Sequence, residues 1–296
     1  MLTFQKITLD DIGLVRHFLQ FQDYRTCDYT IGGIFMWRNF FDSSFAIAEN
    51  MLFFKVRYLD GRTCFTLPVG PGSVKQAVRM LEEYCRAQAL PLVFCTVPAK
   101  GLELLREIYG NALCADANRD WFDYLYRSED LAFFSGKKYH GQRNHVNKFR
   151  RLYPGYRFEE IGPATLERAL AFSRTYLGNR EMKSDTEEHE GCAAIEMFSY
   201  LDRFDAVGGF IEVDGNIVAL SLGEVVGDTL FVHVEKALRE YPGSYQVMVS
   251  EFAKHFTSDR IPFINREEDV GEPGLRTSKL SYLPCELLEK HTVTIG

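Results

Sequence analysis

The strongest constraint on the fold of this chain is an internal repeat. Pro71 and Pro242 each begin a Pro-Gly-Ser triplet, and each triplet is followed by a segment in which apolar residues have helical spacing. These segments end at Pro91 and Pro262, so both pairs of prolines are 171 residues apart (242 − 71 and 262 − 91). A repeat whose internal spacing is unchanged predicts two copies of one structural unit.

Similar patterns of strands and turns precede the two triplets. Apolar segments separated by short turns lie at 43–48, 51–59 and 62–69, and again at 207–213, 216–226 and 229–238. Each set contains an Asp-Gly turn, and this spacing predicts a three-stranded antiparallel meander. Two helical patterns precede each meander. Each half is therefore expected to run strand, two helices, three strands, helix, strand, helix, strand.

We expect an α+β protein with two tandem domains, each a mixed sheet flanked by helices. The predicted domains are residues 1–130 and 155–296, joined by a basic helical linker at 131–154. Chance recurrence of a three-residue motif is the alternative, and the matched order of elements argues against it.

Charge and cysteine content narrow the class of protein. Acidic residues outnumber basic ones, 41 to 34, which argues against a protein that coats DNA. The seven cysteines are scattered and include no Cys-x-x-Cys pair, so reduced thiols are expected. Neither a secretory signal pattern nor a long apolar run is visible, so we expect a cytoplasmic protein without a transmembrane segment. No cluster has metal-ligand spacing, and no metal is expected.

Residues 136–152 are the exception to the acidic balance, with six basic residues and no acidic ones. Val146, Phe149 and Tyr153 follow helical spacing there, which predicts a helix with one apolar and one basic face. Such a face suits transfer RNA, a phospholipid headgroup or the phosphates of a nucleotide cofactor. A linker helix whose charges pair with the acidic second half is the alternative. The predicted basic patch comprises Lys137, Lys138, Arg143 and Lys148.

The second Pro-Gly-Ser triplet offers a candidate anion site. It follows the apolar segment 229–238 and opens a helix. Free backbone N–H groups at a helix start bind phosphates when a glycine permits close approach. Gly243 and Ser244 would hold the phosphates. A turn in which Ser244 only caps the helix is the alternative.

The loop from Arg239 to Ser244, with the strand before it and the helix after it, resembles the GNAT acyltransferase superfamily. Its donor pyrophosphate loop is written Arg/Gln-x-x-Gly-x-Gly/Ala; here the arginine is kept, while Pro242 and Ser244 replace the two glycines. Nearly the whole chain is similar to a bacterial family of tandem-GNAT proteins related to the C-terminal domain of phosphatidylglycerol lysyltransferases, and more distantly to Fem-type aminoacyltransferases. Two segments carry this resemblance, 136–151 (GKKYHGQRNHVNKFRR) and 265–282 (NREEDVGEPGLRTSKLSY).

The resemblance implies transfer of an acyl or aminoacyl group from acyl-coenzyme A, or alternatively aminoacyl-tRNA, to an amine or hydroxyl acceptor. Strand 230–237 would open at its end and bind the donor carbonyl through its backbone. Glu235 or His233 would be the base and Tyr282 the acid. A structural ion pair for Glu235 and simple packing for Tyr282 are the alternatives. The expected donor-binding residues are Val234, Lys236, Arg239, Tyr241, Gly243, Ser244, Tyr245 and Gln246.

The charged loop at 265–279 is the predicted acceptor site, because charges of both signs beside a strand end can orient a small amine or headgroup. A solvated, salt-bridged loop is the alternative. The first domain is expected to be a degenerate copy that supports an active second domain. A non-catalytic module that binds a phosphate-containing ligand is the rival to a transferase. The expected acceptor-binding residues are Asn265, Arg266, Glu268, Asp269, Arg276 and Lys279.

Overall fold

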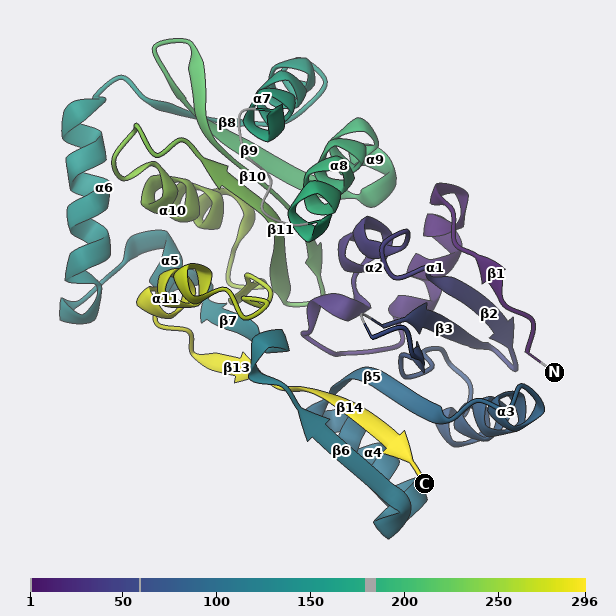
Figure 1. Ribbon diagram of the computed structural model, residues 1–296. Helices are drawn as coiled ribbons and strands as arrows, with labels where there is room; N and C mark the ends of the chain where they lie inside the picture. The colour runs from purple at the N-terminus through teal and green to yellow at the C-terminus, as the bar shows by residue number, and fades with distance from the viewer. Residues whose placement is uncertain (1, 59, 179–184) are drawn as a thin grey trace. The chain divides into compact units, whose positions relative to one another are not determined.

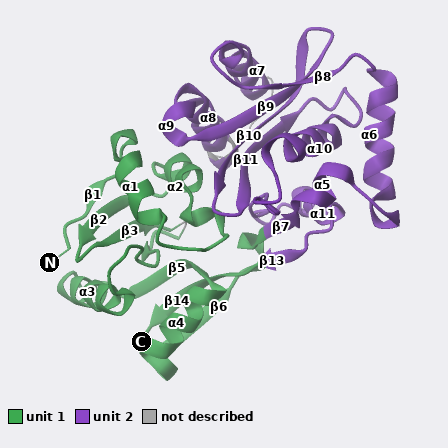
Figure 2. Cartoon of the chain, turned by 180° about the vertical axis from the view of Figure 1, so that it is seen from behind, with its two compact units in different colours: residues 1–123, 288–296 green, residues 124–287 purple. Residues whose placement is uncertain are grey.

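The computed structural model describes residues 2–58, 60–178 and 185–296, and the chain forms two compact units (Figures 1 and 2). Unit 1 comprises Met1–Asp123 with Leu288–Gly296, and unit 2 comprises Tyr124–Leu287. Each unit contains a seven-stranded mixed sheet with helices packed against it. The predicted fold class, two tandem mixed sheets flanked by helices, is confirmed.

The sheet of unit 1 has a single parallel pair, β4 with β5, among the strand pairs recorded for the described residues. Its strands in spatial order are β1 (Gln5–Lys6), β2 (Ser44–Ala48), β3 (Met51–Arg57), β4 (Thr63–Phe65), β5 (Leu92–Pro98), β14 (Lys290–Ile295) and β6 (Leu113–Ala117). Its helices are α1 (Ile12–Leu19), α2 (Ile31–Trp37), α3 (Val74–Ala87) and α4 (Ala99–Tyr109).

The sheet of unit 2 repeats this order, with β11 and β12 as its parallel pair. Its strands in spatial order are β8 (Arg157–Glu160), β9 (Ala206–Val213), β10 (Asn216–Val226), β11 (Thr229–Ala237), β12 (Phe263–Asn265), β7 (Asp123–Arg127) and β13 (Glu286–Leu288). Its helices are α5 (Ser128–Phe133), α6 (His140–Leu152), α7 (Leu166–Gly178), α8 (Asp185–Ser199), α9 (Leu201–Phe204), α10 (Ser244–Phe256) and α11 (Pro273–Ser281).

The two halves of the chain exchange their last strands. β7 follows β6 in the chain but pairs with β12 in the sheet of unit 2, whereas β14 follows β13 but lies between β5 and β6 in unit 1. The pattern of elements predicted one final strand in each half and no exchange. A short apolar run indicates that a strand is buried, but its partner strands are set by contacts distant in sequence.

The basic segment belongs to unit 2 and does not form a separate linker. Val146 and Phe149 on α6 are buried in the core of unit 2, and α6 packs against α10. The division into units therefore differs from the predicted boundaries at this segment and at the C-terminal strand. None of the described helices has the length and apolar character needed to cross a lipid bilayer.

Candidate active site

The central strand β11 of unit 2 has an opening beside its C-terminal half. The parallel strand β12 pairs with β11 only as far as Asn265, which lies opposite Phe231. β11 continues to Ala237 and remains paired with β10 on its other side. After Asn265 the backbone therefore no longer pairs with β11. Polar side chains from the two segments fill the space between them.

A buried ion pair fills this opening. Arg266, the first residue after β12, donates from Nη2 to Oε1 of Glu235 at 2.7 Å. The side chains are only 9% and 13% exposed. They line a small cavity, and burial opposes the charge on Arg266, yet Glu235 and two nearby tyrosines raise the pKa of the guanidinium above its ordinary value. The other cavity walls are apolar: Leu131, Val232, Val249, Phe252, Ala253 and Ile264.

Two polar atoms beside this pair lack partners. Nη1 of Arg266 is buried and makes no hydrogen bond to any described residue. Ser221 lies opposite Glu235 in the β10–β11 register, and its Oγ is buried and equally without a partner in the described chain. Opposed residues of an antiparallel pair share a sheet face. Buried polar groups normally have hydrogen-bond partners. The two atoms on this face of β11 are therefore suited to bind a polar group of a ligand.

Tyr282 supports the guanidinium. It caps the C-terminus of α11, its side chain is buried, and Arg266 lies 4.5 Å from its ring centre. Burial raises the pKa of its phenol above the ordinary value, against the smaller lowering effects of Arg266 and Gln246. The contact of its ring with the guanidinium helps to hold Arg266 in place.

His233 sits at a β-bulge. Gly223 pairs with Val232 and Leu222 with Val234, so His233 has no partner residue on β10. A side chain at Gly223 would meet the carbonyl of Phe231 at 2.1 Å, which explains glycine at this close approach.

The imidazole of His233 lies between two carboxylates. Nε2 is 2.9 Å from Glu224 and Nδ1 is 2.7 Å from Glu267. Burial alone would lower the pKa of His233, but these two carboxylates raise it to about 10. Both ring nitrogens therefore donate at neutral pH, and the geometry does not suit the base role considered for His233. Glu224 was not a predicted site residue, and Glu267, although inside the predicted acceptor loop, was not predicted to contact His233, because no local pattern in the sequence pairs the three residues.

The charged loop after β12 is largely internally bonded. Asp269 accepts two bonds from Arg276, at 2.6 and 2.9 Å, and one from the Tyr124 hydroxyl at 2.5 Å. Burial opposes its ionisation, but these donors and the Gly271 N–H lower the pKa of Asp269 to about 2. The loop is thus held by a bidentate ion pair.

Two further members of the predicted acceptor set, Lys279 and Asn265, follow the same pattern. Lys279 is buried and donates to the backbone carbonyls of Arg266 and Glu268. Asn265 is buried, and its Oδ1 accepts the backbone N–H of Glu267 at 2.6 Å. The loop thereby holds Arg266 against Glu235. Its own conformation is stabilised by Asn265, Asp269, Arg276 and Lys279.

The start of α10, where donor phosphates were expected, is covered by α6. Gly243 precedes the helix with φ +96°, and a side chain there would meet the His145 carbonyl at 2.5 Å and Phe149 at 3.0 Å. Ser244 is buried inside the helix, and its Oγ donates to the Leu238 carbonyl, so it does not cap the helix. Its N–H bonds to the carbonyl of Tyr241. The close-approach space at Gly243 is therefore filled by protein.

The other expected donor-binding residues do not form an open phosphate cradle. Tyr241 packs on Tyr153, with ring centres 5.3 Å apart, and Lys236 pairs with Glu190 at 2.6 Å. Val234 is buried and Arg239 is exposed. Tyr245 is half-buried. The side chains of Tyr241 and Lys236 thus have partners within unit 2, whereas Arg239 is exposed.

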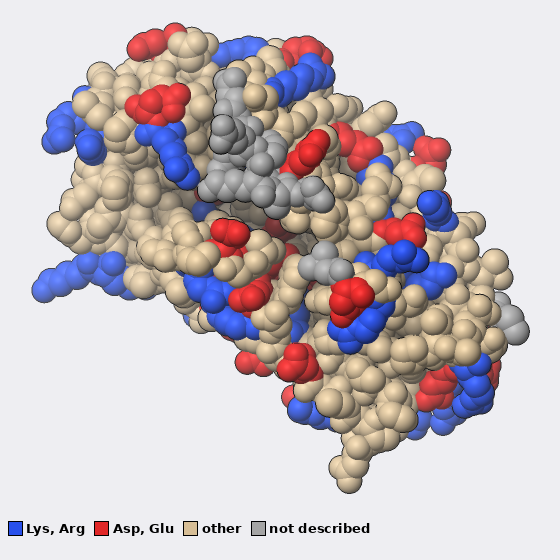
Figure 3. All heavy atoms as spheres, in the orientation of Figure 1, with Lys and Arg blue, Asp and Glu red and all other residues tan. Residues whose placement is uncertain are grey.

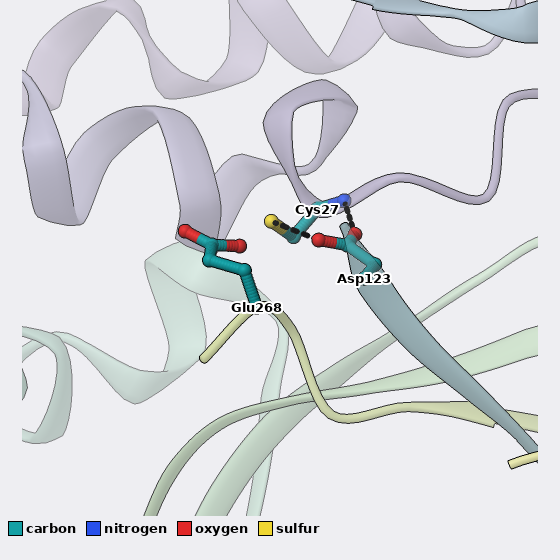
Figure 4. A group of neighbouring side chains, drawn as sticks. All are labelled: Cys27, Asp123 and Glu268. Atoms are coloured by element: carbon teal, nitrogen blue, oxygen red, sulfur yellow. Dashed lines mark hydrogen bonds between the residues drawn. The ribbon is translucent and has the colours of Figure 1, made fainter. Parts of the chain in front are cut away.

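Unit 1 contains a buried ionic cluster of its own. Lys290 on β14 lies 2.7 Å from Asp123 and 2.9 Å from Asp28. Asp123 also accepts the backbone N–H of Cys27 at 2.8 Å and its thiol at 3.6 Å (Figure 4). This cluster joins the exchanged strand β14 to two other segments of unit 1. No local pattern in the sequence signals it, because its members are far apart in the chain.

Comparison with known proteins places these features in a family. A conserved protein of unknown function from Bacteroides thetaiotaomicron, whose crystal structure is known, is 32% identical over 100% of both chains, with a TM-score of 0.91. L-PGS from Bacillus licheniformis shares the fold at 15% identity, with a TM-score of 0.65 over 95% of this chain and 91% of that chain. An uncharacterised protein from Mycoplasmoides gallisepticum is 24% identical over 187 residues, and the match spans 58% of this chain and 56% of that protein.

A family match extends through both units of the chain. The family model described as phosphatidylglycerol lysyltransferase, C-terminal, matches residues 20–294. The chain belongs to this family, as its two diagnostic segments predicted.

Proposed function

We propose that this chain transfers an aminoacyl group from aminoacyl-tRNA to an amine or hydroxyl acceptor, with the reaction centre at Glu235 and Arg266. One observation carries the choice of donor: the family model that matches residues 20–294 is described as a phosphatidylglycerol lysyltransferase, and the name denotes transfer of an amino acid. The loop at 239–244 also departs from the coenzyme A motif, because Pro242 and Ser244 replace its two glycines.

The residues of the opening suit the proposed chemistry. The acceptor's nitrogen or oxygen attacks the ester carbonyl of the aminoacyl group, and its proton passes to Glu235. The Nη1 donor of Arg266 stabilises the negative charge that forms on the carbonyl oxygen. The new amide or ester bond forms as the bond to the terminal ribose oxygen of the tRNA breaks, and that oxygen receives the proton that Glu235 accepted. Tyr282 holds the guanidinium in place.

A binding-only role is the second candidate, and the Glu235–Arg266 ion pair is the observation that favours it. A carboxylate already bonded to a guanidinium at 2.7 Å is partly engaged before any substrate arrives. Turnover that depends on Glu235 would exclude this role.

Calorimetric titration tests the choice of donor. The folded protein is titrated in parallel with coenzyme A, acetyl-coenzyme A and aminoacyl-tRNA. We expect saturable binding of aminoacyl-tRNA and no binding of coenzyme A or acetyl-coenzyme A. Saturable binding of coenzyme A that is lost in Arg239→Glu would overturn the proposed donor and restore the loop at 239–246 as a pyrophosphate site.

A further inference from the structure

We propose that the free edge of β6 in unit 1 binds an extended segment of a partner protein, and that acidic side chains of this segment pair with Arg106. All of the residues concerned belong to unit 1, so the inference goes beyond the proposed transfer reaction and does not depend on it. It gives a binding role to the half of the chain that the sequence suggested was a degenerate copy.

β6 is an edge strand with unpaired backbone groups. It is the last strand of the unit 1 sheet, and β14 is its partner among the strands that the structure describes (Figure 1). Gly296 donates its N–H to the carbonyl of Ala112, which lies opposite. Hydrogen-bonded pairs alternate along an antiparallel ladder, so Cys114 and Asp116 also face β14 with their N–H and C=O groups. The residues whose N–H and C=O groups point to the free edge are Leu113, Ala115 and Ala117.

This edge is accessible to a further strand. Cys114, Asp116 and Ala117 are exposed, and Leu113 and Ala115 are half-buried. Figure 3 shows few charged side chains at the bottom of the view, where β6 and the end of α4 lie in Figure 1. An unpaired edge of this kind is a template for an extended peptide, which pairs with it through main-chain hydrogen bonds.

A surface pocket lies beside the same edge. It has a volume of about 480 Å³, and its lining comprises Leu113 and Ala115 of β6, Gly110 and Asn111 before the strand, and Arg106 of α4. Leu113 and Ala115 therefore offer backbone groups to the free edge and side chains to the pocket. Asp116 alternates with them and lies on the other face of the sheet. A strand added to β6 would place every second side chain over the pocket.

The charge of the pocket selects among possible segments. Arg106 is the charged residue that the described chain contributes to the lining. Its side chain is exposed, and no described residue forms an ion pair or a hydrogen bond with its guanidinium. A guanidinium in this state can bind a carboxylate through two parallel hydrogen bonds, and the amide of Asn111 can donate a further one. Acidic side chains at alternate positions therefore fit the site better than basic ones.

A reversal of charge tests the recognition by Arg106. Two acetylated and amidated heptapeptides carry the same dye, one with threonine alternating with glutamate and the other with threonine alternating with lysine. Fluorescence anisotropy at one ionic strength measures their binding to the full chain. We expect the glutamate peptide to bind about three- to fivefold more tightly, as for one exposed ion pair. Arg106→Glu should reverse this preference, whereas Arg79→Glu, the same change on the exposed face of α3, should retain it.

A proline substitution tests the pairing of the backbone. Ala115→Pro removes an N–H group that faces the free edge and leaves the hydrogen bonds to β14 in place. It should abolish binding of both peptides, whereas Ala115→Ser, which keeps the N–H, should bind them as the wild type does. Urea unfolding shows whether the proline variant is folded, and if it is not, the reversal at Arg106 decides the question.

Each other outcome overturns the inference. A folded wild type that binds neither peptide would show that the edge accepts no strand. Equal affinity for the two peptides would remove Arg106 from recognition, and binding retained by folded Ala115→Pro would place the peptide elsewhere. Dimers detected by light scattering in the wild type and lost in Ala115→Pro would assign the edge to a second copy of this chain.

Discussion

At the scale of single residues, neighbours decide what each titratable group in unit 2 can do. Glu235 and His233 are two residues apart on β11, yet their partners differ. Glu235 meets a guanidinium that keeps one buried donor without a partner among the described residues, whereas both nitrogens of His233 bond to carboxylates. We therefore assign the base role to Glu235 and a structural role to His233.

The pH dependence of stability tests the assignment of His233. Its folded pKa of about 10 lies above the unfolded value of about 6.5. The charged imidazole therefore stabilises the folded state fully below about pH 6.5, and this stabilisation is lost as the pH rises toward 10. The unfolding free energy should fall by about 1.4 kcal/mol per pH unit in this window because of this group. Urea unfolding from pH 7 to 10 measures the slope.

His233→Gln should remove that part of the slope, while the exposed control His17→Gln should keep it. Identical slopes in the wild type and His233→Gln would show that His233 is not protonated between its two carboxylates.

At the scale of the elements, the contact between α6 and α10 leaves no room for a side chain at Gly243. The start of α10 was predicted to within a few residues, because a proline, a glycine and an apolar period are local signals. Its neighbour was not predicted, because no local pattern shows that the His145 carbonyl lies over Gly243. The sequence does show that Pro242 and Ser244 replace the two glycines of the superfamily loop.

A pair of glycine substitutions tests this contact. Gly243 and Gly215 both have positive φ, but only Gly243 lacks room for a side chain. Gly215→Ala should cost about 1–2 kcal/mol of unfolding free energy for the left-handed backbone alone. Gly243→Ala should cost a further 1–3 kcal/mol or so, because the helices must separate. Urea denaturation of both variants measures the difference, and equal losses would contradict the close packing of α6 on α10.

At the scale of the whole molecule, the duplicated fold is joined by the exchange of strands. The repeat in the sequence predicted the order of elements in each half, since the turn and helix signals recur at constant spacing. It did not predict the exchange, because β7 and β14 look like ordinary final strands. It also did not predict the Lys290 cluster, which forms only after β14 enters the sheet of unit 1.

Unit 1 should therefore depend on the C-terminus of the chain. Removing residues 288–296 takes away the strand between β5 and β6 and leaves Asp123 buried without Lys290. We expect the amides of β5 and β6 to lose protection from hydrogen exchange, while those of β10 and β11 keep it. Lys290→Met, which retains the strand, should destabilise unit 1 by about 3–5 kcal/mol through the unpaired carboxylate. Unchanged protection of β5 in the truncated chain would contradict this dependence.

The central claim, aminoacyl transfer at Glu235 and Arg266, is tested most directly by a transfer assay. Transfer RNA charged with a radiolabelled mixture of amino acids is incubated with the protein and a pool of amine and hydroxyl acceptors that includes phosphatidylglycerol. We predict that label leaves the RNA for an acceptor, at least 100-fold more slowly with Glu235→Gln. Folded protein that transfers no label, or Glu235→Gln that transfers it at the wild-type rate, would contradict this mechanism.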